Sequence, residues 1–169
     1  GLAGAAVELN GRSPFDVTPP TDLWSEALHG FAWLSDLKAD GGTEARELAR
    51  RSVNEWILAH GRGDGLPWRA DVVARRLLSW LANSGFLLDS AERATYERVL
   101  DSLTYQLRRL SISYSRAVDG YPRLLSQIAL VVGGLCLADL DDFVREQQAA
   151  FIDELDRQIL ADGGHISRN

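Results

Sequence analysis

The chain has 169 residues, of which 46% are hydrophobic and 25% are charged. This composition is typical of a globular domain with a single buried core. The formal net charge of -6 disfavours nucleic-acid binding, because proteins of that class usually present a basic face. No apolar run approaches the roughly 20 residues that cross a bilayer, so we expect no membrane segment.

Residues 1–20 form the first distinct segment of the sequence. They contain Asn10-Gly11, Ser13-Pro14 and Pro19-Pro20, which are turn and helix-breaking signals. We therefore predict an extended N-terminal arm without a regular helix. Its apolar start lacks a basic region and a long hydrophobic stretch, so we do not interpret it as a signal peptide.

Helical periodicity begins after this arm. One helix is predicted over residues 22–38, with Thr21 as its cap. A second helix, capped by Thr43, breaks at the glycine-rich residues 61–65.

The same periodicity continues through the middle of the chain. A third helix follows Pro67, and Asp89 with Glu92 resembles a capping box for a fourth. Residues 111–120 are polar and loop-like, and Pro122 suits the first turn of a fifth helix.

The last predicted helix starts at Asp141-Asp142, whose negative charge favours a helix N-terminus. Short connections make successive helices antiparallel, so we predict an all-α fold of three αα-hairpins. The single cysteine, Cys136, excludes a disulfide within the chain and is expected to be a small buried hydrophobe. One cysteine fits either the cytoplasm or the periplasm.

Two regions have side chains suited to binding or catalysis. Arg75 shares a helix face with Asp71, and Arg76 shares one with Trp80. Arginine binds a sugar carboxylate and indole stacks on a sugar ring, although an exposed ion pair beside a core Trp80 is the simpler alternative.

The second region is residues 162–169, where a Gly-Gly turn presents His165, Arg168 and Asn169; a frayed terminus is the alternative. We find no motif for a cofactor. His29, His60 and His165 are far apart in sequence, so we predict no metal site.

Four segments, in this order, resemble bacterial heparinase II/III-like proteins. They are SPFDV (13–17), LHGFAW (28–33), WR with ARRLLSW (68–69 and 74–80), and DGGHISRN (162–169). The resemblance implies an incomplete (α/α) toroid over residues 21–169. It also implies a polysaccharide lyase that cleaves acidic, uronate-containing polysaccharide, such as a glycosaminoglycan, by β-elimination.

The resemblance assigns His165 as the catalytic residue, acting as base or carboxylate neutraliser. Gly164 stands where several such lyases have asparagine, and Arg168 or Asn169 would substitute for that donor. Arg75, Arg76 and Trp80 would line the substrate groove.

The family's other catalytic residues and a β-sandwich domain lie further downstream, so the 169-residue chain alone is expected to be inactive. Two alternatives remain open. One is a non-catalytic helical scaffold that binds a glycan or a protein. The other is a hydrolase on a similar toroid, with Glu26 and Asp71 as the carboxylates.

Overall fold

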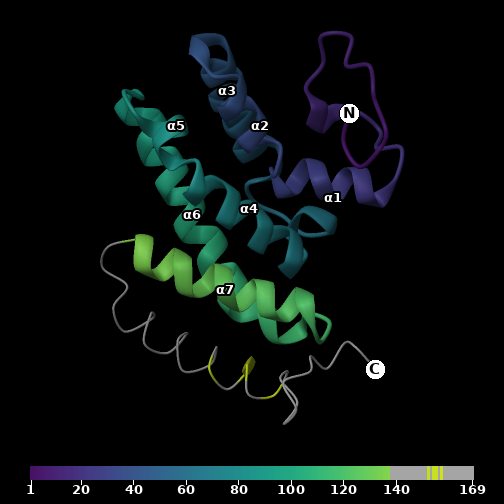
Figure 1. The fold of residues 1–169 in the computed structure, drawn as a ribbon, viewed down its shortest axis with the longest axis vertical. Coiled ribbons are helices and arrows are strands. Elements are labelled where there is room, and N and C mark those ends of the chain that lie inside the picture. The colour runs from purple at the N-terminus through teal and green to yellow at the C-terminus, as the bar shows by residue number, and fades with distance from the viewer. Residues whose placement is uncertain (138–151, 153, 156, 158–169) are drawn as a thin grey trace.

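The described part of the chain is helical, apart from a short N-terminal arm (Figure 1). The computed structural model describes residues 1–137, 152, 154, 155 and 157. Its α-helices and 3-10 helices (η) are, in chain order, η1 (Pro14–Asp16), α1 (Asp22–Gly30), α2 (Leu34–Asp40), α3 (Gly42–His60), η2 (Leu66–Trp68), α4 (Ala70–Ala82), α5 (Ser84–Leu88), α6 (Arg93–Ser113), η3 (Tyr114–Arg116) and α7 (Tyr121–Cys136). Among these residues, Leu2 and Ala5 form an isolated bridge and there is no strand. The predicted all-α class is confirmed.

A break at Phe31 divides the helix predicted over residues 22–38. Phe31 has a left-handed backbone with a φ of 59°. Its side chain is fully buried, with ring centroids 4.9 Å from Trp33 and 5.3 Å from Trp80. Burial of this aromatic side chain outweighs the strain of a bulky residue at positive φ. The continuous helix was therefore a wrong prediction, because periodicity does not report contacts made across the fold.

The helix ends agree only in part with the prediction. Thr21 caps α1 as expected, because its Oγ1 accepts a hydrogen bond from Trp24 N at 3.1 Å. The capping box is wrong, since α6 starts after Glu92 without a side-chain capping hydrogen bond. α6 also continues to Ser113, into the segment predicted as loop. In the arm, the short helix η1 interrupts the expected irregular structure.

Helix α4 lies at the centre of the molecule. It packs against α1 on one side and α7 on the other, while α6 contacts α3, α4 and α7 (Figure 1). The core between these helices includes the fully buried Trp56 and Trp80. Phe15 and Val17 are also buried in this core and anchor the arm. α4 therefore brings its polar side chains into an interior enclosed by several helices.

Gly133 marks a close approach between α7 and α6. A Cβ atom at Gly133 would lie 2.6 Å from Cδ1 of the buried Leu107. We expect Gly133→Ala to lower the free energy of unfolding by about 1–2 kcal/mol, because overpacking exceeds the ~1 kcal/mol that alanine gains over glycine in a helix. Urea unfolding measures the change, and adding Leu107→Val should recover part of it. A variant at least as stable as the unsubstituted chain would contradict this prediction.

Cys136 is exposed near the end of α7, so its predicted burial is wrong. α7 is apolar around most of its circumference, and periodicity alone therefore does not indicate which side faces the core. Across the described ranges, no helix has both the length and the hydropathy needed to cross a membrane.

Candidate functional site

Arg76 lies in the interior of the protein. Its Nη1 donates to His29 O at 3.0 Å and to Pro67 O at 2.9 Å, and its Nε donates to Gln106 Oε1 at 2.7 Å. The guanidinium carbon lies 3.9 Å from the centre of the Trp56 ring. Burial lowers the pKa of Arg76 well below its ordinary value, whereas the three oxygen acceptors favour the charged form. Arg76 thus links α4 to α1, to η2 and to α6.

Trp80 is also a core residue, with only 1% of its surface exposed. Its ring meets Phe31 and Trp56 edge to face, at centroid distances of 5.3 and 5.7 Å. Its Nε1 has no hydrogen-bond partner among the described residues. The binding role expected for Arg76 and Trp80 stays a prediction, and the structure places both side chains inside the fold.

Arg75 belongs to a partly exposed charge network between α1 and the start of α4. Arg69 contacts Glu26 at 2.9 Å and Asp71 at 2.8 Å, while Arg75 lies 3.7 Å from Glu26 and 3.8 Å from Asp71. The predicted Asp71–Arg75 pair is therefore present. Hydrogen bonding to Asp71 is the main cause that raises the pKa of Arg69. The two carboxylates considered for a hydrolase share these two arginines.

His29 and His60 lie side by side beneath the arm, with ring centroids 4.9 Å apart. Phe15 lies 5.8 Å from His29 and 6.0 Å from His60. Trp56 Nε1 donates to His29 Nδ1 at 3.0 Å, which requires that nitrogen to be unprotonated. Burial, followed by the charges of His60 and Arg76, lowers the pKa of His29 to about 4. Burial is also the main cause that lowers the pKa of His60. The two rings therefore pack as neutral aromatic groups at pH 7.

His165, Arg168 and Asn169 lie outside the described residues. The catalytic role expected for His165 and the binding roles expected for the other two stay predictions.

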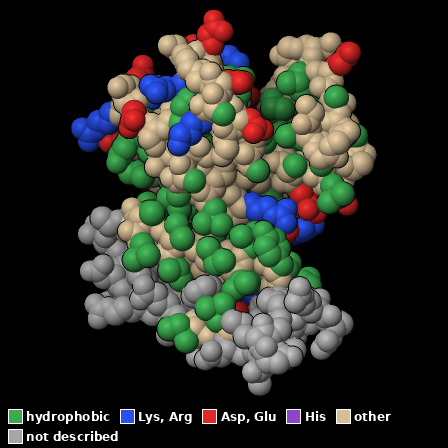
Figure 2. Space-filling view, viewed as in Figure 1, with side chains coloured by type: hydrophobic (Ala, Val, Ile, Leu, Met, Phe, Trp, Pro, Cys, Tyr) green, Lys and Arg blue, Asp and Glu red, His purple; other side chains and the backbone are tan. Residues whose placement is uncertain are grey.

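A groove of about 840 Å³ lies between the arm, α2 and α3. Its apolar lining comes from Leu2, Leu9, Leu28, Trp33, Leu37 and Leu48. Figure 2 shows a hollow in this region, between the arm and the helices, with hydrophobic side chains on its walls. Leu9 and Leu48 are 37% and 39% exposed, so the groove presents apolar surface to the outside. Its volume falls within the range of ligand-binding sites, roughly 300–1,000 Å³.

Polar side chains lie along the rim of the groove. Ser13 Oγ donates to Glu55 Oε2 at 2.8 Å, and Arg51 Nε lies 4.0 Å from Glu55 Oε1. Arg12 on the arm and Asp36 on α2 have no side-chain partner among the described residues, and they lie on different walls. This groove was not predicted from the sequence, because one of its walls is an irregular segment. The available signal was the presence of leucines at positions 2 and 9 of the arm.

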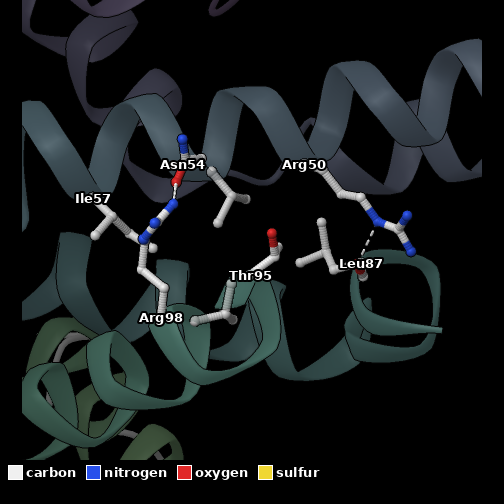
Figure 3. Close-up of a pocket in the computed structure, with 8 residues that line it drawn as sticks. Arg50, Asn54, Ile57, Leu87, Thr95 and Arg98 are labelled. Carbon is white, nitrogen blue, oxygen red and sulfur yellow. Dashed lines mark hydrogen bonds between the residues drawn. The ribbon is translucent and has the colours of Figure 1, made fainter. Parts of the chain in front are cut away.

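A second pocket, between α3 and α6, is a packing gap (Figure 3). Its volume is about 10 Å³, which is no more than the space for one water molecule. Polar side chains close it: Arg50 Nε donates to Leu87 O at 2.7 Å, and Arg98 donates to Asn54.

Across the described residues, these features define an all-helical fold with an open apolar groove. The chain is similar to FtsZ-localized protein C of Caulobacter vibrioides, with 29% identity over 172 residues. The match covers 99% of this chain and 29% of the relative, so the chain spans less than a third of the relative's length. No family model and no solved structure matches the chain.

This similarity corrects the functional predictions. The relative is named for localisation with FtsZ and not for an enzyme activity. The assignments to heparinase II/III-like proteins, to a polysaccharide lyase and to an acidic polysaccharide substrate are therefore wrong. The physical reason lies in the motifs: Phe15, Phe31 and Trp80 are buried, so the three segments that lie within the described residues all contribute to the core. Short patterns of this kind can recur for packing without any shared chemistry.

Proposed function

We propose that this chain is a non-catalytic helical scaffold that binds a protein partner. The observation that carries the proposal is the similarity to FtsZ-localized protein C, which extends over 99% of the chain. FtsZ is the first candidate partner. The groove between the arm, α2 and α3 supports the proposal, because protein interfaces gain much of their stability from apolar side chains buried at their centre.

We also propose that the helices form successive antiparallel hairpins of an incomplete (α/α) toroid. Helices α1, α4 and α7 begin at Asp22, Ala70 and Tyr121, roughly fifty residues apart. The packing of α4 between α1 and α7, and of α6 against α3, supports two layers of helices. In this proposal residues 21–169 form the helical body, and the arm of residues 1–20 forms a wall of the groove.

The function is tested by localisation and by direct binding. A fluorescent fusion of the chain should colocalise with FtsZ in the organism from which the chain comes, whereas the fluorescent protein alone should not. Isothermal titration calorimetry with purified FtsZ should give a saturable binding curve. If the fluorescent fusion is distributed diffusely and the titration with FtsZ releases no heat of binding, FtsZ is not the partner.

A further inference from the structure

The groove has walls suited to a helix. α3 contributes Leu48 and Ser52, which are four residues apart and therefore share one helix face. The second wall contributes Trp33, the N-cap of α2, and Leu37 within α2, which have the same spacing. Backbone groups within these helices are already hydrogen-bonded, so the two walls offer no strand edge to an extended peptide. Along these two walls recognition comes from side chains, as when an amphipathic helix binds in a groove, and the irregular arm forms the remaining wall.

The charges of the groove restrict the kind of partner. Its charged lining residues are Arg12, Arg51, Asp36 and Glu55, whose formal charges cancel. A groove with this balance does not attract polyanions such as nucleic acid or acidic polysaccharide. Glu55 is engaged by Ser13 and Arg51, whereas Arg12 and Asp36 have no side-chain partner among residues 1–137.

We infer that this groove binds an amphipathic helical segment of the protein partner. Apolar side chains of that segment bury against Leu48 and Trp33, an acidic side chain faces Arg12, and a basic side chain faces Asp36. The inference rests on the proposed function, because it specifies how the scaffold binds its partner. Opposite charges on two walls also set the direction in which the segment lies.

The first test compares two substitutions on the same helix. Leu48→Arg places a charge in the groove, whereas Leu58→Arg changes a leucine of α3 that is 73% exposed and does not line the groove. Calorimetry with purified FtsZ should show a Kd at least about tenfold higher for Leu48→Arg, because burial of one leucine is lost. Leu58→Arg should bind within about twofold of the unsubstituted chain, as expected for a surface change. Circular dichroism and melting temperature confirm that both variants are folded.

The second test uses the rim charges. Arg12→Glu and Asp36→Arg should each weaken FtsZ binding several-fold at low salt and less at high salt, because exposed ion pairs are screened. Overlapping helical peptides that cover the FtsZ sequence then locate the bound segment. For that peptide, exchanging its acidic residue for a basic one should restore binding to Arg12→Glu.

A direct readout of the groove comes from labelling the chain with 5-fluorotryptophan. Binding should move the ¹⁹F signal of Trp33, which lines the groove, and leave that of the buried Trp80 in place. If Leu48→Arg does not weaken FtsZ binding and the Trp33 signal does not move, the groove is not the binding site. That result would overturn this inference and leave the proposed function intact. Absence of FtsZ binding by the unsubstituted chain would overturn the proposed function, and this inference with it.

Discussion

Replacing Arg76 with alanine is expected to lower the free energy of unfolding by about 3–5 kcal/mol. The substitution removes the donor from hydrogen bonds to His29 O, Pro67 O and Gln106 Oε1. Each oxygen is then left buried without that partner, and the missing side chain leaves a cavity. Urea unfolding followed by tryptophan fluorescence measures the loss.

Two further variants make the Arg76 measurement specific. Arg93→Ala is the matched control, since that side chain is 90% exposed and its contact with Glu97 should contribute less than about 1 kcal/mol. Arg76→Lys keeps the charge but loses the planar arrangement of donors, so most of the destabilisation should remain. If Arg76→Ala unfolds within about 1 kcal/mol of the unsubstituted chain, other groups or water replace the guanidinium and the predicted network is not stabilising.

Lowering the pH from 7.5 to 5 should destabilise the fold by about 2 kcal/mol through His29 alone. The pKa of His29 is about 4 in the folded chain, against an ordinary value of 6.5. Between these values the unfolded chain binds a proton that the folded chain does not. The stabilisation is therefore complete above pH 6.5 and decreases as the pH falls towards 4. The pKa of His60 is lowered in the same direction, which adds to the loss.

The variant His29→Asn isolates this contribution. Asparagine does not titrate, and its side-chain oxygen can accept the hydrogen bond from Trp56 Nε1 that His29 Nδ1 accepts. Carboxylates titrate in both proteins, so their effect cancels in the comparison. The difference in unfolding free energy between the unsubstituted chain and the variant should shrink by about 2 kcal/mol from pH 7.5 to 5. Parallel pH profiles would show that His29 is not responsible.

The all-α class was predictable because the apolar residues repeat at helical spacing over long stretches. The break after α1 was not predictable, because it depends on the packing of Phe31 against aromatic residues that are distant in sequence. The environment of Arg76 was unpredictable for a similar reason. A polar residue on an amphipathic helix is normally assigned to the surface, but α4 is enclosed by α1, α6 and α7.

The candidate site was harder to predict than the fold. Side-chain types at four-residue spacing identified the Asp71–Arg75 pair, which is local to one helix. The groove instead joins residues from the arm, α2 and α3, and its shape exists only after these segments pack. Similarity over the whole chain was more informative about function than four short segments, because core residues such as Trp80 occur in proteins of many functions.

The burial of Arg76 also bears on the order in which the chain assembles. Its three acceptors lie 47, 9 and 30 residues away, in α1, in η2 and in α6. In a partly folded chain, α4 could pack against only one of its neighbours. The guanidinium would then be buried before all of its hydrogen-bond acceptors are in place, and such a species is high in energy. We therefore expect α1, α4 and α6 to dock together. In a chain cut between α5 and α6, the N-terminal half keeps Arg76 with His29 O and Pro67 O but loses Gln106, so we expect this half to be less stable than the same helices in the whole chain.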